Sequence, residues 1–166
     1  LLAARQAADF ILREMRDDEG RLSHVYAGGR AYGNGFLDDY AALIGGLLEL
    51  HQAQADAAWL EAADALAQRA VAHFWDAEQG GLFFTSDDHE ALLARPVSYS
   101  DLPIPSGNAQ MARHLIRLAA LRERPAWREL ARQTLERFGG GMAHSAQGFS
   151  YMLLALDEWL IGQDPP

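Results

Sequence analysis

Two adjacent carboxylates at a predicted helix start are the residues best suited to chemistry in this sequence. Asp38 and Asp39 follow Phe36, and the apolar periodicity after them predicts a helix from about residue 37. Carboxylates can act as general acid, general base or nucleophile on a sugar, so both are catalytic candidates. A helix N-terminus stabilises the ionised form, which favours a base or a hydroxyl acceptor. The alternative is that one aspartate caps the helix.

Polar and aromatic residues in the predicted loops are the candidate substrate contacts. Ser106-Gly107-Asn108 opens another predicted helix, where backbone N–H groups can meet an anion or a substrate hydroxyl. Tyrosine rings can stack on the apolar faces of sugars. The alternatives are that Ser106 is an N-cap and that the loop aromatics pack onto the helix ends. The predicted substrate contacts are Tyr26, Tyr99, Ser106, Asn108 and Gln147.

The six histidines show no metal-binding spacing, since neither H-x-x-x-H nor H-E-x-x-H occurs. The absence of cysteine excludes disulfides, iron–sulfur clusters and thiolate zinc sites. We therefore expect no metal and no cofactor. His24 and His144 lie in predicted loops, where an imidazole can serve as an acid or base. Residues 87–90, which include His89 and Glu90, are interpreted as a solvated polar run.

Composition excludes several further classes of function. The chain has 166 residues, of which 49% are hydrophobic, enough to form a core. Its net charge of −9 argues against nucleic acids and anionic membranes as partners. All 14 basic residues are arginine, which excludes Schiff-base lysines and Walker-type phosphate loops. No apolar run approaches the roughly 20 residues of a membrane span. No targeting segment is visible, so we expect a cytoplasmic protein. We also expect the chain to be a piece of a longer protein.

Six segments rich in Ala, Leu, Arg and Glu predict helices. Two runs around Gly28-Gly29 predict a short β-hairpin, and residues 80–85 predict half of another. The predicted helices are 2–16, 37–53, 57–75, 107–122, 125 to just before 139, and 147–161.

Loop lengths alternate along the chain. Residues 54–56 and 123–124 are short links, whereas 17–36, 76–106 and 139–146 are long. Because antiparallel helices alternate in direction, the long loops are expected on one face, beside the N-termini of the second, fourth and sixth helices. We expect a small-molecule ligand there.

Two internal repeats support this arrangement. A shift of 68 residues aligns Leu47 with Leu115 and Trp59 with Trp127, and a shift of 60 aligns Leu22 with Leu82. Repeated helical hairpins of this length, with long loops on one side, favour an (α/α) toroid. We therefore predict an all-α fold: one domain over residues 1–166, with three helical hairpins forming part of an (α/α)6 toroid. Open flanks of such a partial ring predict self-association, or pairing with residues that complete the ring.

Six segments of the chain together carry a resemblance to a known family. They are Phe36–Ala41, Phe74–Asp76, Gly80–Thr85, Arg95-Pro96, Ile104–Asn108 and Met152–Asp157. In this order they resemble the spermatogenesis-associated, thioredoxin-domain-containing proteins. The resemblance implies a thioredoxin-like domain ahead of this chain. It also implies a six-hairpin toroid similar to glycosidases and N-acylglucosamine 2-epimerases, of which this chain matches the C-terminal half.

Two classes of function stay open. The first is a sugar-active enzyme or its remnant, a hydrolase, lyase or epimerase, and the second is a non-catalytic binding or scaffold module attached to a thioredoxin-like domain. Under the first, Asp39→Asn and Asn108→Ala should weaken ligand binding while changing stability by no more than about 0.5 kcal/mol.

Overall fold

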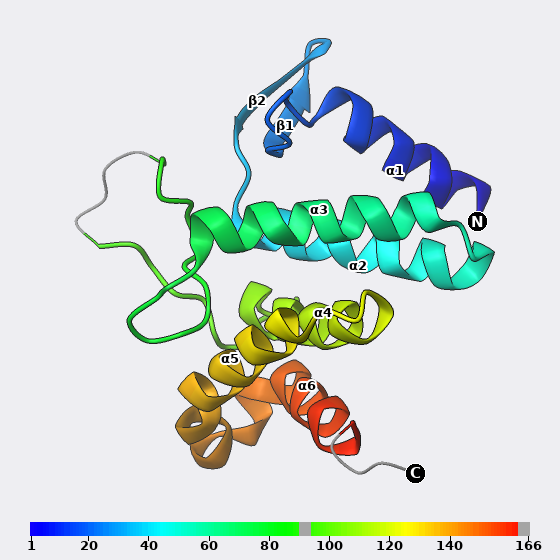
Figure 1. Ribbon diagram of the computed structural model, residues 1–166. Helices are drawn as coiled ribbons and strands as arrows, with labels where there is room; N and C mark the ends of the chain where they lie inside the picture. The colour runs from blue at the N-terminus through cyan, green and yellow to red at the C-terminus, as the bar shows by residue number, and fades with distance from the viewer. Residues whose placement is uncertain (90–93, 163–166) are drawn as a thin grey trace. The chain divides into compact units, whose positions relative to one another are not determined.

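The computed structural model describes residues 1–89 and 94–162. These residues form six α-helices and one two-stranded sheet, which confirms the all-α prediction (Figure 1). They divide into two compact units. Unit 1 comprises Leu1–Phe74 with Phe84–Arg95, and unit 2 comprises Trp75–Phe83 with the chain from Pro96 onward. Among the described residues, no helix has both the length and the apolar character needed to cross a membrane.

Unit 1 is built on an antiparallel helix pair. Helices α2 (Leu37–Gln54) and α3 (Ala57–Phe74) lie side by side and are joined by a tight turn, in which Ala55 takes a left-handed conformation with φ 54° (Figure 1). The fully buried side chains of this unit are mostly aliphatic and lie on both helices, so apolar burial holds the pair together. Helix α1 (Leu2–Glu14) packs on α2 and buries one residue, Ala8.

Unit 2 contains the other helices. Helix α4 (Gly107–Leu121) packs against both α5 (Pro125–His144) and α6 (Ser150–Ile161), and a 3₁₀ turn, η1 (Ala146–Phe149), leads into α6. Ser106 is the N-cap of α4, as the alternative interpretation held, because its Oγ accepts the Ala109 N–H at 3.2 Å.

The predicted hairpin is present in unit 1. Strands β1 (Ser23–Ala27) and β2 (Arg30–Asn34) pair antiparallel, with Ala27 opposite Arg30. Gly28 and Gly29 form the two-residue turn with φ of 60° and 77°, which glycine adopts without strain. The second predicted half-hairpin is wrong. In unit 2 the described backbone makes only an isolated bridge between Trp75 and Leu82.

The 60-residue repeat in the loops is visible in the backbone. An isolated bridge joins Arg16 to Leu22 in unit 1, as Trp75 joins Leu82 in unit 2. Each loop turns through a glycine of positive φ, Gly20 at 83° and Gly80 at 75°. The two units therefore use the same turn after a helix.

The 68-residue repeat extends to buried hydrogen bonds. In unit 1 the Leu22 N–H donates to Tyr40 Oη at 2.9 Å, and in unit 2 the Leu82 N–H donates to Asn108 Oδ1 at 2.8 Å. Asn108 stands 68 residues after Tyr40, so equivalent positions satisfy equivalent loop amides. Burial raises the pKa of the Tyr40 hydroxyl, because a phenolate would lose its hydration there.

Helix α5 does not end before the glycine run as the sequence predicted. It continues through Gly139, Gly140 and Gly141 to His144. The Phe149 ring lies where a Cβ on Gly141 would stand. A glycine is therefore needed there for close packing rather than to end the helix.

This packing predicts opposite effects for two neighbouring substitutions. A Cβ on Gly140 meets no atom within 4 Å, so Gly140→Ala should stabilise unit 2 by roughly 1 kcal/mol through helix propensity. Gly141→Ala should destabilise it by about 1–3 kcal/mol, because the new methyl group overlaps the Phe149 ring. Urea unfolding of both variants measures the two effects. Equal changes in the free energy of unfolding would contradict this packing.

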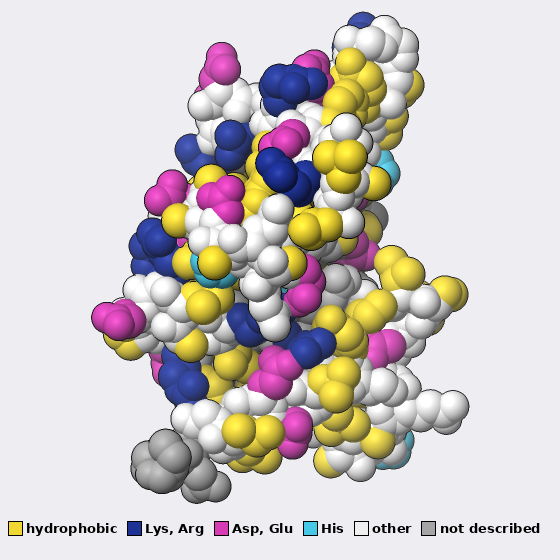
Figure 2. All heavy atoms as spheres, turned by 90° about the vertical axis from the view of Figure 1, so that its right-hand side faces the viewer, with side chains coloured by type: hydrophobic (Ala, Val, Ile, Leu, Met, Phe, Trp, Pro, Cys, Tyr) yellow, Lys and Arg dark blue, Asp and Glu magenta, His cyan; other side chains and the backbone are white. Residues whose placement is uncertain are grey.

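Exposed apolar side chains occur near both ends of the described chain. Leu1 and Leu2 are 66% and 68% exposed, and Leu160 and Ile161 are 55% and 67% exposed. Figure 2 shows hydrophobic side chains at the surface among arginine and acidic ones. Exposure of this kind is typical of surfaces that meet another chain segment. Self-association, or pairing with further residues, stays a prediction.

Candidate functional site

The strongest candidate for chemistry is a histidine–aspartate pair in unit 1. Asp39 occupies the first turn of α2, and its Oδ2 accepts the Phe36 N–H at 2.8 Å. The same oxygen lies 2.8 Å from His24 Nδ1 on β1. Asp39 therefore caps the helix, as the alternative interpretation held, and also orients an imidazole. Both side chains are accessible, His24 at 46% and Asp39 at 31%.

His24 lies between two hollows of unit 1. The first, which we call the loop pocket, has a volume of about 600 Å³. The second is an apolar groove of about 390 Å³ between α1 and α2, and His24 and Asp39 lie at its polar end. The loop pocket is lined by His24, Val25, Tyr32, Gly33, Asn34, Phe36, Thr85, Asp88 and His89.

Phe36 is the aromatic centre of the loop pocket. Its ring stacks on Phe84 with centroids 4.9 Å apart and planes at 14°. The His24 ring meets it edge-on at 4.9 Å, and the His89 ring lies 5.1 Å away. The pocket thus combines an apolar ring with two imidazoles.

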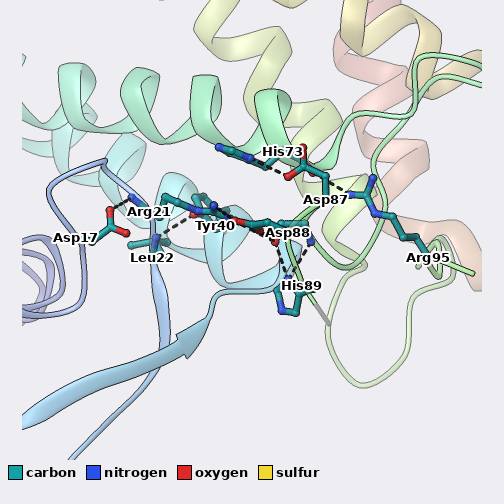
Figure 3. Close-up of polar contacts among 10 residues, drawn as sticks. Asp17, Arg21, Leu22, Tyr40, His73, Asp87, Asp88, His89 and Arg95 are labelled. Carbon is teal, nitrogen blue, oxygen red and sulfur yellow. Dashed lines mark hydrogen bonds and ion pairs between the residues drawn. The ribbon is translucent and has the colours of Figure 1, made fainter. Parts of the chain in front are cut away.

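The loop of residues 84–89 is held by a network of polar contacts (Figure 3). Asp87 and Asp88 are nevertheless exposed, as expected of a solvated run, and Glu90 lies outside the described residues. Asp88 forms an ion pair with Arg21 and accepts the Ser86 hydroxyl at 2.7 Å. The Ser86 Oγ lies 2.6 Å from His89 Nδ1, and the Ser86 N–H donates to the same nitrogen at 3.2 Å. These contacts fix Asp88 and His89 in the pocket wall.

The other side of this loop is tied to the end of α3. Arg95 Nη2 donates to the carbonyl oxygens of Thr85 and His73, at 2.5 and 2.8 Å (Figure 3). Asp87 Oδ1 lies 2.9 Å from His73 Nδ1, and the Asp87 N–H donates to the His73 carbonyl at 2.9 Å. The wall of the loop pocket is therefore preorganised rather than shaped by a ligand.

The charges at the loop pocket leave it close to neutral. Asp88 is paired with Arg21, His24 lies against Asp39, and no arginine lines the pocket among the described residues. The Thr85 hydroxyl is buried in this wall and has no hydrogen-bond partner within residues 1–89 and 94–162. Such a wall suits a neutral polyhydroxyl compound better than an anion.

The other unit 1 candidates lie outside the loop pocket. Asp38 is half-buried in the first turn of α2 and lines neither of these two hollows. Tyr26 packs edge-on against Phe10 of α1, with centroids 4.9 Å apart. Tyr32, another loop tyrosine that the sequence offered for stacking on a sugar, does line the pocket and is 47% exposed.

Two unit 2 candidates have their side chains engaged in the fold. Asn108 is fully buried, and its amide bonds the Leu82 N–H, the Leu82 carbonyl and the Ser98 carbonyl at 2.7–2.8 Å. Ser106 is 3% exposed, and its hydroxyl also donates to the Tyr99 carbonyl at 3.3 Å. The expectation that Asn108→Ala would leave stability nearly unchanged is therefore revised.

The remaining two candidates are exposed. Tyr99 is 50% exposed, and its ring stacks with those of Phe138 and Phe149 at 6.0 and 5.9 Å. Gln147 is exposed in η1. A ligand contact by either side chain stays a prediction.

The sequence pointed to Asp39 and to His24 separately but did not reveal the contact between them. His24 is 15 residues earlier, and the hairpin returns the chain so that β1 passes the start of α2. In the sequence, the Gly28-Gly29 turn was the one signal that the chain folds back here and brings β1 close to the start of α2. Within the described residues, no group of three or more His, Cys, Asp or Glu side chains is arranged to hold a metal ion.

Sequence comparison gives the relatives of the chain. It is 32% identical to spermatogenesis-associated protein 20 of Rattus norvegicus over 172 residues, covering 92% of this chain and 21% of that protein. The Mus musculus protein is 35% identical over 134 residues, which cover 75% of this chain and 17% of that protein. This chain is homologous to part of spermatogenesis-associated protein 20. It spans about a fifth of the length of such relatives. No protein-family model matches it.

Structural comparison shows which solved fold this homologue of spermatogenesis-associated protein 20 resembles. A GH76 α-mannanase of Bacteroides thetaiotaomicron superposes with a TM-score of 0.64 over 94% of this chain and 43% of the mannanase chain. The two sequences are 15% identical over the match, so the likeness concerns the fold. The mannanase is an α/α toroid, which bears out the predicted fold class.

Proposed function

We propose that unit 1 binds a neutral sugar in the loop pocket. The observation that carries this is His24, which is oriented by Asp39 and lies beside Phe36 in the wall of a hollow of about 600 Å³ that no arginine lines among the described residues. Polar groups on Asn34, Thr85 and His24 suit hydroxyl groups, and an aromatic ring suits the apolar face of a pyranose. The toroid shared with an α-mannanase agrees with a carbohydrate ligand by analogy of fold alone.

A non-catalytic binding module is the second candidate, and one observation favours it. Glycoside hydrolysis uses two carboxyl groups on either side of the scissile bond. Among the described residues that line the loop pocket, Asp88 is the one carboxylate, and it is paired with Arg21. This wall therefore supports binding better than hydrolysis.

Isothermal titration of the chain with mannose, α-linked mannobiose, N-acetylglucosamine and glucuronate tests the proposal. We expect at least one neutral sugar to bind, and glucuronate to bind more weakly, because the wall offers Asp88 and no arginine to a carboxylate. Binding of glucuronate alone, or of none of the four, would overturn the proposal.

Asn34 is the side chain with which to map the pocket. It is exposed on β2 and lines the loop pocket, so Asn34→Ala should weaken sugar binding about 5–10-fold, as expected for one lost hydrogen bond. Gln54→Ala, at the opposite end of α2, is the matched control and should leave the affinity unchanged. Titration calorimetry of both variants provides the measurement. An equal loss in the two variants would place the sugar elsewhere.

A further inference from the structure

The two nitrogens of the His24 ring have different environments. Nδ1 is 2.8 Å from the Asp39 carboxylate, while the ring lines the loop pocket with nearly half of the side chain exposed. A carboxylate accepts a proton and does not donate one, so it places the imidazole proton on Nδ1. In the neutral ring, Nε2 therefore carries the lone pair. The Phe36 N–H holds the same carboxylate oxygen and so fixes the orientation of the pair.

His89 is the second imidazole of this wall. Its Nδ1 lies 2.6 Å from the Ser86 Oγ and 3.2 Å from the Ser86 nitrogen, while the Ser86 hydroxyl donates to Asp88. The two imidazoles flank Phe36, with ring centroids 4.9 and 5.1 Å from it. His24 is held through Nδ1 by a carboxylate, the arrangement that orients a histidine as a base.

We infer that His24 is the general base of the loop pocket and that the pocket catalyses ring opening of a neutral reducing sugar. This inference rests on the proposed function, since the sugar must first bind there. His24 Nε2 takes the proton of the O1 hydroxyl. The C1=O1 double bond forms as the C1–O5 bond breaks, and O5 takes a proton from water. Closure on the other face reverses both transfers: O5 returns its proton to the hydroxide, and O1 takes its proton back from His24 Nε2. The product is the other anomer, and no oxidant, reductant or further reactant is consumed.

Asp39 acts through His24 as a positioning residue. Its Oδ2 contacts His24 Nδ1 and the Phe36 N–H, and nothing in this step requires it to touch the sugar. Asp39→Asn separates the charge of Asp39 from these two contacts. An amide oxygen in the place of Oδ2 still accepts both the Phe36 N–H and the His24 Nδ1–H, so the ring keeps its orientation, but the negative charge that stabilises the imidazolium formed in the step is lost.

The rate of mutarotation, followed by polarimetry after dissolving α-D-mannose or α-D-glucose, tests the inference on the whole chain. We expect the chain to accelerate mutarotation in a saturable way. His24→Ala should remove about 100-fold of that acceleration, and added imidazole should restore part of it. His51→Ala is the matched control, because His51 Nδ1 bonds the Asp56 carbonyl at the other end of α2. It should keep the full rate.

Asp39→Asn supplies an independent arm. Asp39 lines the apolar groove and not the loop pocket, so the weaker binding expected from the sequence is revised. The affinity of Asp39→Asn for the sugar, measured by calorimetry, should equal that of the unaltered chain, while its rate falls about 100-fold. Circular dichroism establishes that each variant is folded. If His24→Ala does not fold, Asp39→Asn and His24→Gln decide the outcome.

The outcomes separate the two proposals. Failure of the unaltered chain to bind any sugar rejects the proposed function and this inference with it. Sugar binding with a mutarotation rate equal to that of buffer rejects the inference alone. Full activity in folded His24→Ala, His24→Gln or Asp39→Asn also rejects it.

Discussion

Replacing Asn108 with alanine is expected to lower the free energy of unfolding of unit 2 by about 3 kcal/mol or more. The Asn108 side chain is fully buried and satisfies both backbone groups of Leu82 as well as the Ser98 carbonyl. Each buried polar group left without a partner costs about 1–3 kcal/mol. Urea unfolding followed by circular dichroism measures the loss.

Gln110→Ala is the matched control for this substitution. Gln110 lies in the same helix, is half-buried, and its amide makes one hydrogen bond, to the Pro105 carbonyl at 3.0 Å. Loss of this hydrogen bond should lower the free energy of unfolding by less than about 1 kcal/mol. A stable Asn108→Ala chain that has lost sugar binding would show instead that Asn108 is a ligand contact.

Replacing Arg137 with leucine is expected to lower the free energy of unfolding of unit 2 by about 3 kcal/mol. Arg137 Nη1 lies 2.9 Å from Asp76 Oδ2 and also donates to the Gly80 carbonyl. The two side chains are only 14% and 8% exposed. The substitution leaves a buried carboxylate without its cation, which is far more costly than the loss of an exposed pair. Urea unfolding gives the magnitude.

Arg132→Leu is the control on the same helix. Arg132 pairs with Glu129 and Glu136, and hydrogen bonds from Arg132 and Gln133 lower the pKa of Glu129 to about 2. All three charged side chains are at least 40% exposed, so water and salt screen the pairs and the expected loss is close to zero. Equal losses at Arg132 and Arg137 would contradict the buried role of Arg137.

Helix positions could be predicted from the sequence because periodicity and end signals agree locally. The second helix is predicted at 37–53 and observed as Leu37–Gln54, and the hairpin follows from Gly28-Gly29. The end of α5 could not be predicted by the same means. Three consecutive glycines normally end a helix, and only the approach of Phe149 to Gly141 shows why a glycine stands inside this one.

The candidate site was predictable in part. The position of Asp39 at a helix start follows from local sequence, but its contact with His24 depends on how the hairpin folds back. In the sequence alone, nothing near Asp88 indicates an ion pair, because its partner Arg21 stands 67 residues earlier in the chain. Contacts between distant segments leave no periodic signal, so local reasoning could not find this wall.

Asn108 shows how a correct observation led to an incomplete conclusion. An asparagine in a first helical turn has little helix-forming reason to be there, which singled it out as a ligand contact. Its repeat equivalent, Tyr40, shows the structural reason, since each side chain accepts the N–H of a loop leucine. The repeat was visible in the sequence, but this shared role was not.

The most direct test of the central claim is a crystal structure of the chain grown with α-linked mannobiose. The sugar should be ordered in the loop pocket, with a hydroxyl within hydrogen-bonding distance of His24 Nε2 and a pyranose ring near Phe36. A loop pocket without sugar at a saturating concentration, or a sugar bound only elsewhere on the chain, would contradict the account.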